Sequence, residues 1–200
     1  LQGTKAYGVH VRPLTVPARE GRSEMYEQPN FYWAQENFLR ELQRGKAWHW
    51  SNLRPVLIVG EAMGGAMDLI PPLGVYAAML REQGRALDYP GGAARVSQAV
   101  DVDLLARAIA WSGETAAARN EAFNVTNGDV FTWENVWPAI ADGLEMKPGK
   151  PQPLSMAQEY PKWIAPWEEL RRKHDLVSPS LEEFVGLSFQ YADYSMRYGQ

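Results

Sequence analysis

Helical spacing of apolar residues begins directly after a proline near the start of the chain. Asn30 follows that proline and belongs to the residue types that cap helix N-termini well, so the pattern predicts a helix over residues 31–44. Phe31, Phe38 and Leu42 recur along this segment at helical spacing. The first predicted element is therefore an amphipathic helix with a defined beginning.

A continuous aliphatic run follows this helix, over residues 53–60. Such a run is typical of a strand that is buried on both faces, as in a parallel sheet covered by helices. A helix followed by a buried strand is the second half of a βαβ unit. The pattern therefore predicts an α/β fold.

Helix and strand patterns alternate through the rest of the chain. Asp101 and Thr132 are predicted to be the N-caps of two helices. Residues 1–29 are predicted to form an extended start and a long surface loop, and the proline-rich segment 147–166 a surface linker. The other expected elements are a helix over 73–82, a strand and turn over 87–92, an extended segment over 96–100, a helix over 102–111, a strand over 121–125, a helix over 133–140, and short helices over 167–173 and 181–189.

Composition adds a broad class to this picture. The 200 residues are 46% hydrophobic and 22% charged, which is typical of a globular chain of one domain or two small ones. The net charge of -4 lacks the positive field that nucleic acid or an anionic membrane selects. No apolar run approaches the roughly 20 residues that span a bilayer, and the first residues do not begin a signal peptide. We therefore expect a cytoplasmic protein without nucleic-acid or membrane partners.

Residues that bind metals are scarce in this chain. It contains no cysteine, which excludes disulfides and thiolate catalysis and fits a reducing compartment. Its three histidines, His10, His49 and His174, lie in different segments without ligand spacing. No metal site is predicted.

Tyr32 is the first candidate for chemistry, because it lies in the first turn of the first predicted helix. The peptide dipoles are positive there and favour an oxyanion held nearby. A phenol in that position is able to donate a proton to a substrate oxygen, or to polarise it. The alternative is a core aromatic residue with a satisfied hydroxyl. Lys5 taken by itself is a solvated charge.

The segment 60–74 is rich in Gly, Met and Pro. It suits a loop that lines a cavity, to which Met63 and Met67 would offer adaptable apolar surface. An irregular connection packed on the core accounts for the same composition equally well.

The usual phosphate-binding and nucleophile motifs are missing. The sequence has neither G-x-G-x-x-G nor G-x-x-x-x-G-K-[ST], and it has no G-x-S-x-G elbow. Tyrosine-dependent dehydrogenases normally carry a lysine four residues after the tyrosine, where its charge assists the phenol. Here that position is Glu36, so the pattern fails.

Several stretches of the chain match the motifs of one protein family. They are Leu1 to Tyr7, Asn30 to Asn37, Arg54-Pro55 with Gly60, Val75 to Ala78, Asn120 to Phe131, and Trp167 to Glu169. By these stretches the chain resembles, almost from end to end, the progesterone 5β-reductase/iridoid synthase family, an atypical branch of the extended short-chain dehydrogenases/reductases. Trp33 and Asn37 depart from the family's Asn-Phe-Tyr-Tyr-x-x-Glu-Asp motif, where the family has Tyr and Asp.

The resemblance implies a particular part of the family's fold. Residues 1–200 would form one α/β unit, the C-terminal part of a Rossmann-type doubly wound sheet plus a substrate-binding lobe. Residues 1–60 would hold the end of the sheet, with Leu1 at the start of a strand, and residues 61–200 mainly the lobe and C-terminal helices. The Gly-rich N-terminal half would be absent through truncation, which we favour, or come from a separate chain. Oligomeric state stays open, a homodimer included.

The resemblance also implies a reaction, the reduction of the carbon-carbon double bond of an enone or enal by hydride from NADPH, with NADH as the alternative. Tyr32 would hydrogen-bond the carbonyl oxygen as it becomes an enolate. Lys5 would support Tyr32 from a separate strand and hold the cofactor ribose. The residues that would border the nicotinamide are Pro55, Val56 and Ile58, and those that would shape the pocket for a small apolar carbonyl substrate are Met63, Met67 and Tyr76.

Two other functions remain open at this point. An epimerase or dehydratase of nucleotide sugars would belong to the same extended group, although the apolar Met63, Met67 and Ile70 speak against a diphosphate site. A fragment that keeps the substrate lobe and cannot hold a cofactor is the non-enzymatic alternative.

Overall fold

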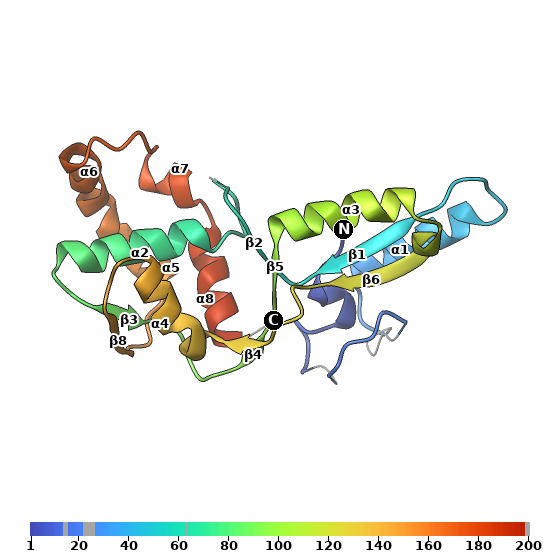
Figure 1. The fold of residues 1–200 in the computed structure, drawn as a ribbon, viewed down its shortest axis with the longest axis horizontal. Helices are drawn as coiled ribbons and strands as arrows, with labels where there is room; N and C mark the ends of the chain where they lie inside the picture. The colour runs from blue at the N-terminus through green and yellow to red at the C-terminus, as the bar shows by residue number, and fades with distance from the viewer. Residues whose placement is uncertain (14–15, 22–26, 63, 199–200) are drawn as a thin grey trace. The chain divides into compact units, whose positions relative to one another are not determined.

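The computed structural model describes residues 1–13, 16–21, 27–62 and 64–198. The chain folds into two compact units, each built from two segments (Figure 1). Unit 1 comprises Leu1–Ile58 and Gln98–Asp129, and unit 2 comprises Val59–Ser97 and Val130–Gln200. Each unit is described by itself below.

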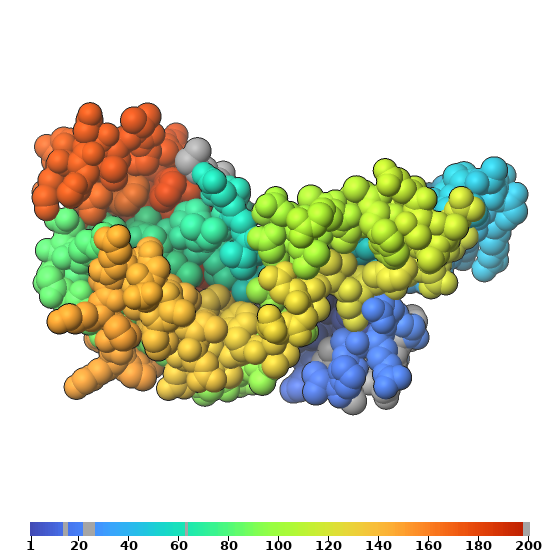
Figure 2. All heavy atoms as spheres, viewed as in Figure 1, coloured from blue at the N-terminus to red at the C-terminus, as the bar shows by residue number. Residues whose placement is uncertain are grey.

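Unit 1 is a layered α/β structure around two parallel strands, β1 and β6, whose residues pair in register from Ser51 with Glu121 to Pro55 with Val125. Helix α3 packs on β1, and Figure 2 shows its side chains as an outer layer of this unit. The elements of unit 1 are η1 (Thr4–Tyr7), α1 (Phe31–Gln43), β1 (Ser51–Pro55), β5 (Ala99–Asp101), α3 (Val102–Glu114), η2 (Ala116–Ala118) and β6 (Glu121–Val125). Strand β2 (Leu57–Val59) pairs with β5, and its last residue is assigned to unit 2.

The core of unit 1 lies between α3 and the strands. Its buried centre is formed by Leu53, Val100, Leu105 and Val125. Val56 and Ile58 pack against it from the segment that follows β1, together with other partly buried side chains. Burying each of these aliphatic side chains contributes about 1.5–3 kcal/mol. This core therefore holds in place the end of β1 and the residues after it, where the predicted nicotinamide-side residues Pro55, Val56 and Ile58 lie.

Unit 2 is mainly helical, with two small two-stranded sheets: β3 pairs with β8 in parallel, and β4 with β7 antiparallel. Its aromatic core includes Phe189, which stacks on Tyr160 and meets Trp163 edge to face. The elements are α2 (Ile70–Glu82), β3 (Leu87–Tyr89), β4 (Val96–Ser97), β7 (Phe131–Thr132), α4 (Trp133–Gly143), β8 (Pro148–Pro151), α5 (Met156–Glu159), η3 (Tyr160–Trp163), α6 (Ile164–Lys173), α7 (Leu181–Val185) and α8 (Ser188–Tyr198).

The three predicted helix caps are confirmed. The side chain of Asn30 accepts a hydrogen bond from the Tyr32 N–H, and that of Asp101 accepts from the first-turn N–H groups of α3. Thr132 accepts from Asn135 N–H in the same way. These side chains satisfy N–H groups that have no partner within the helix, which is why each helix begins at the predicted residue.

Three predictions about local structure were wrong. The start of the chain is not simply extended, because Lys5 lies in the 3₁₀ helix η1 and not on a strand, and Gly8 with a φ of 76° ends that helix. The segment 147–166 is no linker: it holds β8, α5 and η3, and Met156 and Trp163 within it are buried. The predicted helix over 181–189 is interrupted at Gly186, whose φ of 57° is left-handed.

The described helices include none with the length and apolarity to cross a membrane. Among the described residues there is also no group of three histidine, aspartate or glutamate side chains placed to hold a metal ion.

Asp193 of α8 provides a first test of how unit 2 is held together. Its carboxylate accepts hydrogen bonds from Ser155 Oγ at 2.6 Å, Met156 N–H at 2.9 Å and Ala157 N–H at 3.1 Å, so it caps α5 from another helix. Asp193→Ala leaves these donors buried or half-buried without a partner, and we expect the free energy of unfolding to fall by about 1.5–3 kcal/mol. Urea denaturation of the full-length protein measures the change. A change below about 0.5 kcal/mol, the usual range for a surface substitution, would contradict it.

Candidate active site

Lys5 and Tyr32, the two predicted catalytic residues, are brought together through one side chain. Asn30 accepts a hydrogen bond from the Tyr32 N–H through its Oδ1 at 3.0 Å, and donates one from its Nδ2 to the Lys5 carbonyl at 2.7 Å. The main chains of the two residues are therefore bridged by a single carboxamide. The sequence predicted that Asn30 caps α1, but its position in the sequence did not reveal the second contact, with the Lys5 carbonyl.

The phenol of Tyr32 lies beside the backbone at the beginning of η1. A Cβ placed on Gly3 would be 3.9 Å from the Tyr32 hydroxyl, and Gly3 is two residues before Lys5. The Tyr32 carbonyl accepts a hydrogen bond from the Gln2 side chain at 2.8 Å, and the Tyr32 ring packs on Phe31 with centroids 4.3 Å apart. The N-terminal segment thus holds the main chain of Tyr32, and its ring contacts Phe31 of the same helix.

The reactive groups of both side chains stay available. Tyr32 is half-buried and Lys5 is exposed. Within the ranges that the structure describes, neither the Tyr32 hydroxyl nor the Lys5 ammonium has a hydrogen-bond or ion-pair partner. The Tyr32 hydroxyl and the Lys5 ammonium are donors on residues whose main chains are hydrogen-bonded, and they are suited to binding oxygen atoms of a ligand.

Trp33 has a structural task in this arrangement. It is one of the two departures from the family motif, and its side chain is buried. Its indole N–H donates to the Ala6 carbonyl at 2.7 Å, so it ties η1 to α1 one residue beyond the Asn30 contact. Asn37, the other departure, is exposed.

A buried ion pair anchors α1 to the sheet below these residues. Arg54 on β1 donates to Glu36 of α1 at 2.7 Å, and their side chains are 7% and 12% exposed. Arg54 also donates to the Tyr7 hydroxyl at 3.0 Å, and Tyr7 donates to the Asn124 side chain of β6 at 2.6 Å. Asn52 donates to Glu36 at 3.0 Å. The network thus joins η1, α1, β1 and β6.

The pKa values of the two partners are shifted in opposite directions, down for Glu36 and up for Arg54. Burial raises the pKa of Glu36, but hydrogen bonds and charges from Arg40 and Arg54 outweigh it and bring the pKa below its usual value. Burial lowers the pKa of Arg54, and contacts with Tyr7 and Glu36 more than reverse this. Both groups are therefore charged at neutral pH. Glu36, which stands where related dehydrogenases carry a lysine, is a structural partner of arginine here.

Sequence reasoning missed the Arg54 network. An arginine inside an otherwise aliphatic strand was a usable signal, because a buried charge requires a partner. What the sequence does not show is which acid supplies that partner.

The residues predicted to border the nicotinamide lie at the end of β1. Pro55 is the last residue of the strand and is buried opposite Val125. Val56 and Ile58 pack their side chains on the core of unit 1, which leaves their main chains as the parts to meet a ligand. Their role in binding stays a prediction.

The predicted substrate residues belong to unit 2. Met63 lies outside the described residues, and Met67 is 68% exposed. Tyr76 is buried on α2, and its hydroxyl donates to the Asp88 carbonyl at 3.1 Å. Burial, aided by the Asp88 charge and opposed by Arg85, raises the pKa of Tyr76 to about 12. Tyr76 is therefore neutral at physiological pH and has a structural hydrogen bond.

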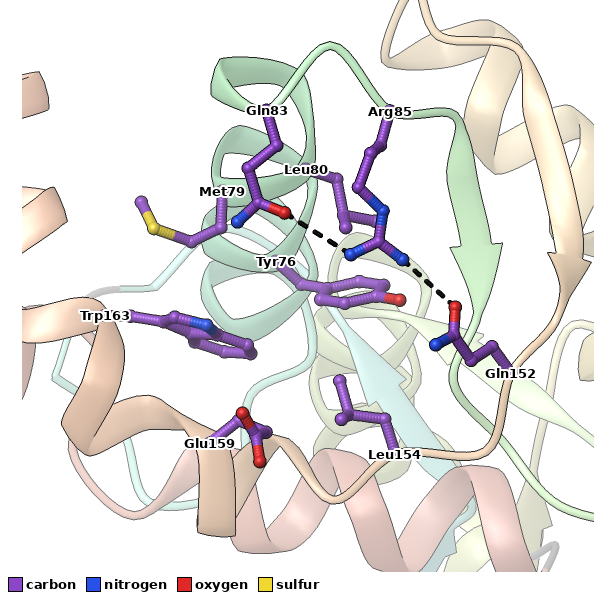
Figure 3. Close-up of a pocket in the computed structure, with 9 residues that line it drawn as sticks. All are labelled: Tyr76, Met79, Leu80, Gln83, Arg85, Gln152, Leu154, Glu159 and Trp163. Carbon is purple, nitrogen blue, oxygen red and sulfur yellow. Dashed lines mark hydrogen bonds between the residues drawn. The ribbon is translucent and has the colours of Figure 1, made fainter.

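Tyr76 forms one wall of a small pocket inside unit 2, with a volume of about 140 Å³ (Figure 3). The Tyr76 and Trp163 rings lie on one side, with centroids 6.0 Å apart. The Arg85 guanidinium crosses the rim and donates to Gln83 and Gln152. The lining residues are Tyr76, Met79, Leu80, Gln83, Arg85, Gln152, Leu154, Glu159 and Trp163. Lys5 and Tyr32 are not among them.

Known proteins resemble this chain in sequence and in fold. A family profile for the PRISE-like Rossmann-fold domain matches residues 1–191. The chain is 35% identical over 182 residues to the short chain dehydrogenase gsfE of Penicillium aethiopicum, covering 86% of this chain and 48% of that protein. It is 34% identical over 173 residues to an (S)-8-oxocitronellyl enol synthase of Catharanthus roseus, covering 82% and 44%. The chain therefore spans about half the length of these curated relatives.

Solved structures agree on the fold. A GDP-L-fucose synthetase of Naegleria fowleri superposes with a TM-score of 0.57 at 14% identity, covering 94% of this chain and 62% of that one. A UDP-glucose 4-epimerase of Brucella ovis in complex with NAD gives a TM-score of 0.52 at 16% identity, covering 96% and 63%. At these identities the likeness concerns the fold alone. The predicted Rossmann-type α/β fold is confirmed.

Proposed function

Because this chain belongs to the family of PRISE-like Rossmann-fold domains, we propose that it forms part of a nicotinamide-dependent reductase that acts on the carbon-carbon double bond of an enone or enal. The name of the Catharanthus roseus relative supports the reaction type, since that protein is an enol synthase. An enol is what remains at the carbonyl when hydride adds to the far carbon of a conjugated enal and the oxygen takes a proton.

The residues of unit 1 fit one end of a nicotinamide cofactor. The Tyr32 hydroxyl and the Lys5 ammonium are donors without partners in the described part of the chain, and such donors suit the hydroxyl groups of a ribose and a carbonyl oxygen. When bound, the cofactor supplies the hydride. NADPH is the preferred form and NADH the alternative. The diphosphate would have to be held elsewhere, because the sequence has no glycine-rich phosphate loop.

In the reaction Tyr32 would hydrogen-bond the substrate carbonyl oxygen as negative charge develops on it. The positive end of the α1 dipole reinforces this, since Tyr32 is the second residue of the helix. Lys5 would hold the ribose and keep a positive charge near the phenol. Hydride would add to the double-bond carbon farther from the carbonyl, the electron pair of that bond would form a new double bond to the carbonyl carbon, and the carbonyl pair would move to the oxygen. The resulting enolate would be stabilised where Tyr32 donates.

The substrate class that fits is a small apolar carbonyl compound. Met67 offers exposed apolar surface and Tyr76 a rigid aromatic wall in unit 2. With Met63, they are proposed to contribute to the substrate site of the whole protein. Pro55, Val56 and Ile58 are proposed to border the nicotinamide.

The observation that carries this proposal is the Asn30 bridge, which links the main chains of Lys5 and Tyr32, while the described residues give neither side-chain donor a partner. The test is NADPH oxidation by the full-length protein with a small conjugated enal, the saturated aldehyde and a nucleotide sugar. Deuterium from labelled NADPH should appear only at the double-bond carbon of the enal that lies farther from the carbonyl. Turnover of the nucleotide sugar alone, or deuterium at the carbonyl carbon, would overturn the proposal.

A further inference from the structure

We propose that Asn30 is a positioning residue that sets the distance between Lys5 and Tyr32, beyond its task as a helix cap. This inference rests on the proposed function for its kinetic part and on the structure alone for its conformational part. Asn30 is the side chain that contacts the main chains of both residues.

The two ends of the Asn30 carboxamide do separate things. Its oxygen accepts the Tyr32 N–H, which is the ordinary capping contact of α1. Its nitrogen donates to the Lys5 carbonyl, which also accepts the Gly8 N–H at 3.0 Å and so has both acceptor positions filled. Serine and aspartate are able to make the first contact, but they have no N–H group for the second.

The Lys5 end needs this contact because η1 is short. It spans four residues, and its internal hydrogen bonds include Ala6 N–H to the Gly3 carbonyl and Gly8 N–H to the Lys5 carbonyl. A 3₁₀ turn of that length has poor hydrogen-bond geometry and little stability of its own. Trp33 holds it at Ala6, one residue after Lys5. Without the Asn30 donor, the α1 contact that remains next to the Lys5 main chain, among the described residues, is the Trp33 hydrogen bond to Ala6.

Three substitutions separate the cap from the bridge. Asn30→Asp keeps an oxygen for the α1 N–H groups and has no donor for Lys5. Asn30→Ser keeps the oxygen and replaces the carboxamide N–H with a hydroxyl on a side chain that is one bond shorter, whereas Asn30→Ala removes both contacts. We expect hydrogen exchange of a peptide covering residues 3–8 to become faster in all three variants of the full-length protein. Exchange over residues 33–43 should become faster only in Asn30→Ala. This readout needs no cofactor or substrate, so it stands even if the proposed function fails.

The kinetic part uses a double-mutant cycle with Lys5. We expect Asn30→Ser to lower kcat/KM for an enal by about tenfold, the loss associated with a small misplacement of a catalytic group. If Asn30 acts through Lys5, Asn30→Ser should have no further effect in a protein that already carries Lys5→Met. A merely structural role predicts that the two losses multiply.

The two experiments distinguish a failure of the positioning role of Asn30 from a failure of the proposed function. Unchanged exchange over residues 3–8 in Asn30→Ser, or multiplicative losses in the cycle, would overturn the positioning role of Asn30. A wild-type protein without any enal reduction would instead contradict the proposed function, while the exchange experiment would still decide whether Asn30 holds η1.

Discussion

Replacing Arg54 with leucine is expected to lower the free energy of unfolding by about 3–5 kcal/mol, the range for removing one partner of a buried ion pair. The pair lies between β1 and α1, and the substitution removes the buried cation of the largely buried Glu36 carboxylate, which keeps only the half-exposed Arg40 as an ion-pair partner among the described residues. It also removes the donor to the Tyr7 hydroxyl. Urea denaturation of the full-length protein, with Arg54→Leu beside the wild type, measures the loss.

Arg40 supplies the matched control, because it pairs with the same carboxylate from the surface. Arg40 donates to Glu36 at 2.7 Å, but half of its side chain is exposed. We expect Arg40→Leu to cost less than about 1 kcal/mol, as exposed pairs do. Equal losses for the two arginines would show that burial does not decide the strength of this network.

The pH dependence of stability follows from the same carboxylate. The pKa of Glu36 is lower in the folded protein than its usual value of about 4.3. Its contribution is therefore fully present above the unfolded pKa and is lost as the pH falls through the lower folded pKa. In Glu36→Gln this contribution should be missing, so the loss of stability below about pH 5 should be smaller than in the wild type. An identical acid dependence in the two proteins would mean that Glu36 is not stabilised by its arginines.

The sequence predicted those parts of the fold that depend on neighbouring residues. Asn30, Asp101 and Thr132 were found as caps because capping is a contact over two or three residues. The strands were found in part. The aliphatic run predicted as one strand over residues 53–60 is divided into β1 and β2, and β1 pairs in parallel with β6, which coincides with the strand predicted over 121–125.

The failures concern contacts made over long distances in the chain. Prolines mark both linkers and the first turns of helices, so the segment 147–166 was misread, and only the packing of Met156 and Trp163 identifies it as part of the core. Arg54 contacts Glu36 and Tyr7, which are 18 and 47 residues away in the sequence, and no local pattern reveals contacts over such separations. The 3₁₀ turn around Lys5 had a local signal in the flanking Gly3 and Gly8.

The candidate site divides in the same way. Tyr32 was chosen from its place in the first helical turn and Lys5 from a family motif, and the structure adds Asn30 as a side chain that links their main chains. Sequence reasoning noted Glu36 only because it stands four residues after Tyr32, where tyrosine-dependent dehydrogenases normally carry a lysine. Its partner Arg54 explains it, because a lysine at that position would face a buried guanidinium.

Removing the hydroxyl of Tyr32 should separate catalysis from stability. In Tyr32→Phe we expect kcat for enal reduction to fall by about 10- to 100-fold, because a hydrogen bond to a charged oxygen contributes about 1.5–3 kcal/mol. The free energy of unfolding should change little, since the described residues give the Tyr32 hydroxyl no partner to lose. Steady-state kinetics with NADPH and a small enal, and urea denaturation of the same samples, measure the two effects.

Tyr7→Phe is the reciprocal control, because it removes a phenol hydroxyl from the same unit. That hydroxyl joins Arg54 to Asn124, with contacts at 3.0 and 2.6 Å, and is buried. Its removal should lower the free energy of unfolding by about 1–3 kcal/mol and leave the kcat of the folded protein nearly unchanged. If Tyr32→Phe kept full activity, or if Tyr7→Phe lost as much activity as Tyr32→Phe, the assignment of enolate stabilisation to Tyr32 would be wrong. The pair is informative because Tyr7 lies in η1 with Lys5 and Tyr32 lies beside the start of η1, yet within the described residues the Tyr7 hydroxyl has two partners and the Tyr32 hydroxyl has none.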